Sequence, residues 1–229
     1  MPRPPRITAP GVAYHLLNRR VRRLPVFEED ADYAAFQRVL ADSLDRPDAP
    51  RLLAYCLMPN HWHLVVRAGE HSNLSTWAQW LTVTHTRRWH AHRHTVGEGP
   101  LYQGRFKSFP VQEDGHFLTV CRYVEANPLR AGLVARAEEW RWCSLWVRRN
   151  GPATRSPRLG EWPVERPRNW LADVNRRIPE GPLGQVRQSA ARGVPLGTDP
   201  WKARIATRLG LSPTPRPRGR PRKEPQKPP

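Results

Sequence analysis

The stretch YCLMPNHWHLVV, residues 55–66, decides the fold that this sequence predicts. It consists of two apolar runs separated by Pro59-Asn60, a dipeptide typical of a turn. We therefore expect two strands, residues 51–58 and 61–67, on either side of a short bend. Residues two apart in a strand share a face, so His61 and His63 project together with Cα atoms about 6.5 Å apart.

Strand and helix patterns alternate on both sides of this bend. Alternating apolar residues predict strands at 12–18 and 105–111, and helical spacing predicts helices at 30–44, from 74 to about 94, and from 114 to about 127. Several connections are too short for parallel crossovers. The expected fold is α+β, with a mainly antiparallel sheet flanked by helices.

The chain is strongly basic. Its 229 residues contain 38 Lys and Arg against 20 Asp and Glu, which gives a net charge of +18 and a pI near 11.3. Basic residues displace the counterions condensed on nucleic acid, so a phosphate-rich partner is the leading expectation. A GC-rich genome would also raise the arginine content, but it leaves the net charge unexplained.

Composition argues against a membrane or secreted protein. The mean hydropathy is −0.71, no run of about eighteen apolar residues occurs, and the first residues lack the apolar stretch of a signal peptide. The three cysteines, Cys56, Cys121 and Cys143, are odd in number and form no CxxC pair. Reduced thiols in a cytoplasmic, nucleoid-associated protein are therefore expected.

The paired histidines have more than one interpretation. Neutral imidazole is a common metal ligand, and two imidazoles on one face of a strand can hold one ion. Spacing alone favours two histidines that merely decorate a polar face, because HxH is a frequent chance pattern. A triple-histidine phosphotransferase site is excluded, since residue 65 is Val65.

The helix predicted at 114–127 carries a tyrosine on its flank. Four residues form its apolar stripe: Phe117, Val120, Cys121 and Val124. Tyr123 lies about 120° from the centre of that stripe, with Asn127 one turn further on and His116 two turns back on the same side. Such a tyrosine can serve as a nucleophile, with His116 as a candidate general base, or it can be an ordinary boundary residue.

Several segments in one order resemble a known family. They are GVAYHLLNRRVRR, YCLMPNHWHLVV, QGRFKS, YVEANPLRAGLV and WRWCSLW, and they span about residues 11–146. In these the chain is similar to the REP-associated tyrosine transposases of the HUH single-tyrosine transposase superfamily. One departure is Arg20, where the family more often has Gly.

The resemblance implies a ferredoxin-like HUH domain and a specific chemistry. His61 and His63 would bind Mg²⁺ or Mn²⁺, Asn127 would supply a further ligand, and Tyr123 would be the nucleophile. The implied enzyme is a transposase-type endonuclease that cleaves and rejoins single-stranded DNA, often folded into a hairpin, through a 5′-phosphotyrosine intermediate. Two alternatives are a hairpin-binding protein that does not cut, and a nuclease that uses water as its nucleophile.

Basic and aromatic residues near this site are candidates for DNA contacts. The candidates for backbone contacts are Arg87, Arg88, Arg105 and Lys107, and those for base stacking are Trp89 and Tyr102. For any single residue, a solvated basic face is nearly as good an explanation.

Proline content divides the chain. We expect an HUH domain at 1–150, a Pro/Arg-rich linker at 151–180, a small helical segment at 181–212 and a disordered basic tail at 213–229. The tail resembles an AT-hook, in which Arg218, Arg220, Arg222 and Lys223 would enter the minor groove. A solubilising tail is the alternative. The protein is expected to be a monomer or a homodimer, with the monomer favoured.

Overall fold

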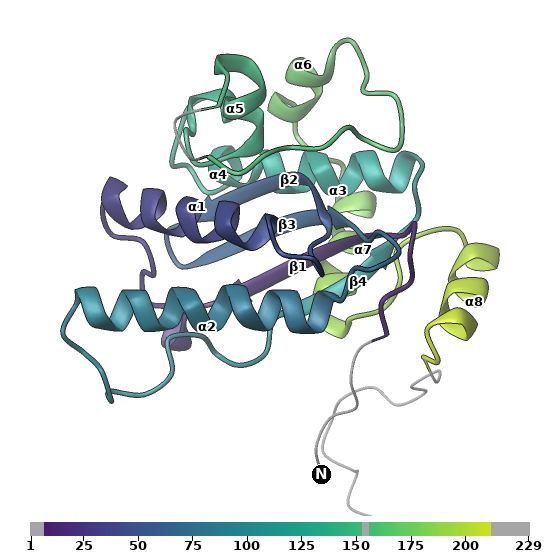
Figure 1. Cartoon of the computed structure of the whole chain (residues 1–229). Helices are drawn as coiled ribbons and strands as arrows, with labels where there is room; N and C mark the ends of the chain where they lie inside the picture. The colour runs from purple at the N-terminus through teal and green to yellow at the C-terminus, as the bar shows by residue number, and fades with distance from the viewer. Residues whose placement is uncertain (1–6, 153–155, 212–229) are drawn as a thin grey trace, which may run out of the picture.

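The computed structural model describes residues 7–152 and 156–211 (Figure 1). Four strands, β1 (Ala13–Arg19), β2 (Arg51–Met58), β3 (His61–Arg67) and β4 (Lys107–Val111), form an antiparallel sheet in the order β2-β3-β1-β4. Together with α1 (Asp30–Leu44) and α2 (Leu74–His92) they follow the βαββαβ order of ferredoxin-like folds. The predicted α+β fold with an antiparallel sheet is confirmed.

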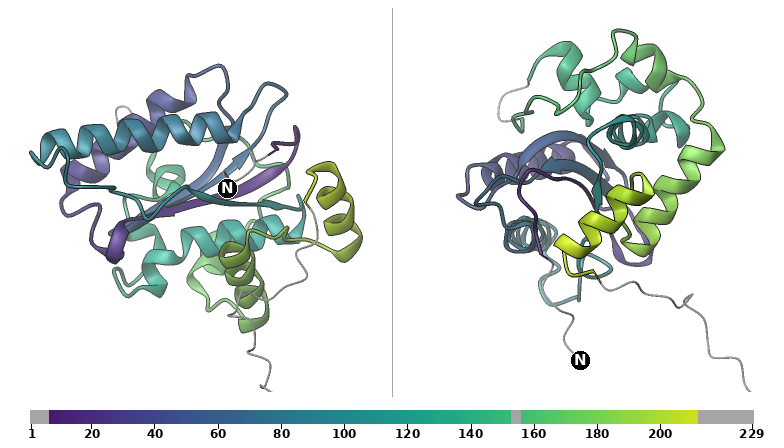
Figure 2. Two further views of the ribbon diagram at one scale, coloured as in Figure 1. Left: turned by 90° about the horizontal axis from the view of Figure 1, so that it is seen from below. Right: turned by 90° about the vertical axis from the view of Figure 1, so that its right-hand side faces the viewer.

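Helices cover both faces of the sheet, as the two views of Figure 2 show. α1 and α2 lie on one face, and α3 (Gly115–Glu125) lies on the other. The shorter helices that follow are α4 (Asn127–Arg130), α5 (Ser144–Asn150), α6 (Trp170–Asn175), α7 (Glu180–Arg192) and α8 (Asp199–Arg208). No helix in the described ranges is both long enough and apolar enough to cross a bilayer.

Side-chain alternation along β3 divides the interior into two cores. Trp62, Leu64 and Val66 are fully buried in the core beneath α1 and α2. Val65 belongs to the core beneath α3, on the face that also carries His61 and His63. Because both faces of β3 are covered, its sequence is an almost continuous apolar run. The two histidines lie on the α3 face, at the end of the strand where that face meets a polar site.

The last strand is shorter than predicted. The expected strand at 105–111 begins only at Lys107, because Gly104 has a φ of +152° and turns the chain just before it. The buried Tyr102 forms an isolated bridge with Arg20 on the far side of this turn. Residues before β4 therefore belong to a loop that is tied to the end of β1.

A buried histidine connects α2 to that loop. His85 is 3% exposed, and its Nδ1 lies 2.8 Å from the hydroxyl of Tyr102. The same hydroxyl accepts a hydrogen bond from Trp62 Nε1 at 3.1 Å, so its proton is donated to His85. Burial, partly offset by Asp32, lowers the pKa of His85 to about 3. His85 is therefore neutral in the folded protein at neutral pH.

We expect His85 to make the protein labile in acid. Unfolded His85 takes up a proton below pH 6.5, whereas the folded form stays neutral down to about pH 3. The unfolded state thus binds more protons in this window, and the free energy of unfolding falls by about 1.4 kcal/mol per pH unit as the pH drops. Urea unfolding at pH 7.5 and pH 5.0 measures this loss.

The variant His85→Asn isolates this contribution, since its Oδ1 can still accept the proton of Tyr102 but does not titrate. The difference in unfolding free energy between pH 7.5 and pH 5.0 should shrink by about 2 kcal/mol in this variant. An identical difference in both proteins would show that His85 is not responsible.

The residues after the sheet pack against both of its faces. Within 151–180, expected as a linker, Trp170 and Val174 are buried in the core beneath α3. α7 adds Leu183 and Val186 to that core. The segment is thus part of the folded body, although its Pro/Arg-rich composition gave no sign of these contacts.

Both edge strands of the sheet have backbone partners from later in the chain. On β2, Leu57 N–H donates to the carbonyl of Trp142 at 2.9 Å. Beside β4, Leu196 N–H donates to Pro110, and Gln112 N–H donates to Leu196, both at 2.9 Å. Segments outside the ferredoxin-like unit therefore cover the hydrogen-bonding groups at both sides of the sheet.

Candidate active site

His61 and His63 share one face of β3, as predicted, with ring centroids 4.8 Å apart. His61 opposes Arg19 in the register of β1, and its Nδ1 lies 2.5 Å from Oδ1 of Asn60. His63 is 3% exposed, and its Nδ1 lies 2.9 Å from Nε2 of His15 on β1. Each imidazole is thus oriented through Nδ1, which leaves Nε2 without a partner among the described residues.

Burial keeps both imidazoles uncharged. It lowers the pKa of His61 to about 4, with a further contribution from Arg19. It lowers the pKa of His63 still more strongly, and the neighbouring His61 and His15 act in the same direction. Neutral imidazoles have a lone pair available for a cation at neutral pH.

Tyr123 reaches the histidines from the helix that covers this face. Asp114 caps α3 by accepting from the N–H of His116 at 2.7 Å, and the apolar stripe of α3 is buried against the sheet. The ring of Tyr123 is half-buried and lies edge-on to His63, with centroids 5.7 Å apart. The guanidinium of Arg130, in α4, lies 4.9 Å from the centroid of the Tyr123 ring.

The three side chains line one open cleft of about 650 Å³. The basic residues on its walls come from β1, the loop before β4, β4 and α7: Arg19, Arg105, Lys107, Arg187 and Arg192. The cleft is lined by the start of β3, the end of β1, β4, α3 and α7, which brings together residues about 130 positions apart in the sequence. A surface of this charge suits a polyanion.

The other candidate DNA contacts lie elsewhere. Arg87 lines a neighbouring groove of about 620 Å³, whose wall shares Arg105 with the cleft. Arg88 pairs with Asp42 of α1 at 3.3 Å. The predicted minor-groove residues Arg218, Arg220, Arg222 and Lys223 lie outside the described residues.

Trp89 and Tyr102 do not offer free stacking surfaces, contrary to expectation. Both are buried, at 8% and 7% exposure. Trp89 is occupied by two guanidinium groups, those of Arg20 and Arg93, which lie 4.5 and 4.8 Å from its ring. Tyr102 binds His85 through its hydroxyl. Both side chains therefore stabilise the interior.

Unlike Tyr123, Asn127 and His116 do not line the cleft. Asn127 is buried, its Oδ1 lies 3.5 Å from Arg130 Nη1, its Nδ2 has no described partner, and it is absent from the cleft wall. His116 bonds to Asp114 through Nδ1 at 2.8 Å, about 10 Å along the helix axis from Tyr123. The role of His116 as a general base stays a prediction.

Two buried polar residues were not predicted from the sequence: His15 beside this site, and Glu125 in the core beneath α5 and α6. His15 contacts both His63 and Tyr123, with its ring centroid 6.2 Å from that of Tyr123. Glu125 accepts from Ser144 Oγ at 2.6 Å and from Trp170 Nε1 at 2.7 Å, and burial raises its pKa. The alternation of β1 predicts which face of the sheet His15 lies on, but not that it contacts His63. The burial of Glu125 depends on segments far away in the sequence, which no local pattern indicates.

The histidine pair fits a divalent cation. Nε2 of His63 is buried without a partner, and Nε2 of His61 is free beside it. Among the described residues, the cleft wall contributes no carboxylate, so the remaining ligands there would be amide, phosphate or water oxygens, which hard cations accept.

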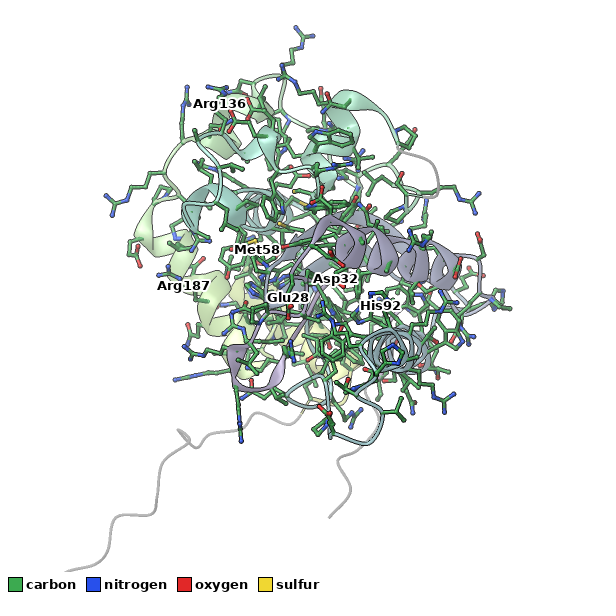
Figure 3. All side chains as sticks on the ribbon, turned by 90° about the vertical axis from the view of Figure 1, so that its left-hand side faces the viewer. Glu28, Asp32, Met58, His92, Arg136 and Arg187 are labelled. Atoms are coloured by element: carbon green, nitrogen blue, oxygen red, sulfur yellow. The ribbon has the colours of Figure 1, made fainter. Side chains whose placement is uncertain are left out.

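A second group of potential metal ligands lies elsewhere. Among the described residues, the only three His, Cys, Asp or Glu side chains grouped closely enough to hold an ion are Glu29, Asp32 and His92. Figure 3 labels Asp32 and His92, where the start of α1 meets the end of α2. Asp32 is already bound by Arg93 at 2.6 Å. This group is separate from the cleft.

The sequence model described as "Transposase IS200 like" matches residues 8–127, just over half of the chain. The chain therefore belongs to the IS200-like transposase family. Transposases of this family are DNA-cleaving enzymes and generally use a divalent metal ion. The matched segment includes all four strands and α1 to α3, and hence both histidines and Tyr123.

A solved structure described as a REP-associated tyrosine transposase bound to a REP hairpin has the same fold. Its TM-score is 0.52 at 17% sequence identity, and the match covers 72% of this chain and 95% of that chain. A candidate transposase from Deinococcus radiodurans matches with a TM-score of 0.38 and 20% identity over 54% of this chain and 95% of its own. No curated protein matches the chain in sequence.

Proposed function

We propose that this protein cleaves and rejoins single-stranded DNA at hairpins, with Tyr123 as the nucleophile and a divalent cation, Mg²⁺ or Mn²⁺, held by His61 and His63. The observation that carries the proposal is the meeting of Tyr123 with the histidine pair in one basic cleft, with the Tyr123 and His63 rings 5.7 Å apart. Asn127 is the proposed further ligand, through its amide oxygen, which would have to leave its contact with Arg130 and turn toward the cleft. Because one chain supplies all of these groups, the proposed site works in a monomer.

The walls of the cleft indicate how DNA would enter. Arg105 and Lys107 line the cleft from the segment at β4, and Arg187 and Arg192 line it from α7, so a phosphodiester backbone in the cleft would meet positive charge from both segments. Arg105 also borders the groove that Arg87 lines, which offers a path for neighbouring nucleotides. The solved relative of the same fold is bound to a REP hairpin, which supports a hairpin substrate.

The proposed reaction is a transesterification. The phenol oxygen of Tyr123 forms a bond to phosphorus, the bond from phosphorus to the 3′ oxygen breaks, and that oxygen leaves as a 3′-hydroxyl. When bound, the cation would polarise the phosphate and neutralise charge that develops in the transition state. The product is an ester of similar energy, so another 3′-hydroxyl can attack it and rejoin the strand without ATP.

Arg130 has a specific place in this scheme. Its guanidinium lies over the Tyr123 ring, 4.9 Å from the centroid, and beside Asn127. This cation–π contact helps to hold the Tyr123 ring in its place beside the histidine pair.

The direct test uses hairpin-bearing single-stranded DNA labelled at either end, incubated with the protein and Mn²⁺ and separated under denaturing conditions. The expected result is a protein adduct that carries only the 3′-labelled fragment, and a free 5′-labelled fragment that ends in a hydroxyl. Cleavage without any adduct would identify water as the nucleophile. Hairpin binding without cleavage in either cation would indicate a binding protein.

A further inference from the structure

We propose that His15 is a positioning residue for the cation site: it accepts the Nδ1 proton of His63 and so presents the Nε2 lone pair of His63 to the cleft. This inference rests on the proposed function, because it assigns His63 as a ligand. It concerns a residue on a different strand, 48 positions away in the sequence.

The contact between the two rings is short and fully enclosed. His15 Nε2 and His63 Nδ1 lie 2.9 Å apart, and the ring planes are within 12° of each other. His15 is 0% exposed and packs edge-on against Phe109 and Tyr123, with centroids 5.0 and 6.2 Å away. This packing allows the His15 ring little freedom to turn away from His63.

The outer nitrogens of the pair have no partners. His15 Nδ1 and His63 Nε2 are both buried, and neither has a hydrogen-bond partner among the described residues. A buried polar nitrogen without a partner is unfavourable. When His63 Nδ1 is the donor, the second proton of the pair lies on His15 Nδ1, so a cation at His63 Nε2 has to offset the cost of that unpaired N–H. The nitrogen of His63 faces the cleft, whereas that of His15 is enclosed.

One proton is shared between the two rings, and its position decides what His63 can do. If His63 Nδ1 carries it, His63 Nε2 has a lone pair directed at the cleft and can bind a cation. If His15 Nε2 carries it, His63 Nε2 bears a proton and can only donate a hydrogen bond. A cation in the cleft therefore requires His15 to be the acceptor, as in the outer hydrogen bonds of metal-bound histidines.

Two substitutions at residue 15 distinguish the role of its hydrogen-bond acceptor from the role of its ring in packing. His15→Phe keeps a ring in the space but removes the acceptor, and His15→Gln places an amide oxygen where Nε2 lies. Mn²⁺ binding is measured by the loss of the free-ion electron paramagnetic resonance signal. All variants carry Tyr123→Phe, and a hairpin oligonucleotide is present so that DNA oxygens can contribute without cleavage.

We expect His15→Phe to weaken Mn²⁺ binding about 10- to 100-fold, the usual loss when the hydrogen-bond partner of a metal ligand is removed. His15→Gln should bind Mn²⁺ nearly as tightly as the parent does. The variant His63→Ala, measured in parallel, should lose binding at least as strongly. In the unsubstituted chain with Mg²⁺, ¹⁵N spectra of the histidine side chains should place the proton of the pair on His63 Nδ1.

The outcomes distinguish the two proposals. Parent-like Mn²⁺ binding by His15→Phe, combined with a loss in His63→Ala, overturns the role of His15 and leaves the proposed function intact. Equal losses in His15→Phe and His15→Gln also overturn it, as does a ¹⁵N spectrum with the proton on His15 Nε2 in the presence of Mg²⁺. Parent-like binding by His63→Ala removes the cation from this pair and contradicts the proposed function itself.

Discussion

Replacing Tyr123 by Phe is expected to eliminate the covalent protein–DNA adduct, a loss of at least about a thousandfold, because no other hydroxyl can substitute for a displaced nucleophile. The substitution removes one oxygen from a half-buried ring that lines the open cleft. Stability and hairpin affinity should therefore stay close to those of the parent. The adduct is quantified on denaturing gels with end-labelled hairpin DNA.

Tyr33→Phe is the matched control. Tyr33 lies in α1 on the opposite face of the sheet, where its ring stacks on Trp142 with centroids 5.0 Å apart. It loses the same atom at a distance from the cleft, so its adduct yield should equal that of the parent. An adduct formed equally well by Tyr123→Phe would show that the nucleophile has been misassigned.

The double variant His61→Ala and His63→Ala is expected to abolish cation-dependent cleavage while hairpin binding persists. His61 and His63 are the imidazoles that line the cleft and would bind the cation through nitrogen. A bound cation contributes several kcal/mol of transition-state stabilisation. Their loss should reduce the cleavage rate by at least about a hundredfold at any Mn²⁺ concentration. Single-turnover cleavage and filter binding measure the two properties separately.

His92→Ala distinguishes this site from the other group of potential ligands. His92 belongs to the Glu29, Asp32 and His92 group at the ends of α1 and α2. With the cation in the cleft, this variant should cleave hairpin DNA at the parental rate and with the parental Mn²⁺ dependence. A loss confined to His92→Ala, with the double variant still active, would move the cation to that group.

Local sequence patterns were sufficient to predict how the side chains of Tyr123 and of the histidine pair project from their elements. The alternation of a strand predicted that His61 and His63 share a face, and the angular spacing of a helix predicted that Tyr123 leaves the flank of α3. Both predictions depend only on neighbours within two turns or a few residues. The structure contains both arrangements.

Features that depend on strand register or on distant segments were not predictable in this way. His15 meets His63 only because β1 pairs with β3 in one register, with Leu17 opposite His63. Trp89 was misjudged because the two arginines that cover it come from a loop after β1 and from the end of α2. The contact with Arg20 joins residues far apart in the sequence and has no local signal, whereas Arg93 lies about one helical turn from Trp89.

The segment around Leu196 that covers β4 has a consequence for how copies of the protein meet. An edge strand with unpaired backbone N–H and C=O groups can pair with a strand of another chain. At the β4 edge, hydrogen bonds of Leu196 to Pro110 and Gln112 already use these groups. A proteolytic nick that released residues 193–211 would uncover it and favour intermolecular sheets. The segment between α7 and α8 thus blocks the addition of a strand from another copy of the chain at this edge of the sheet.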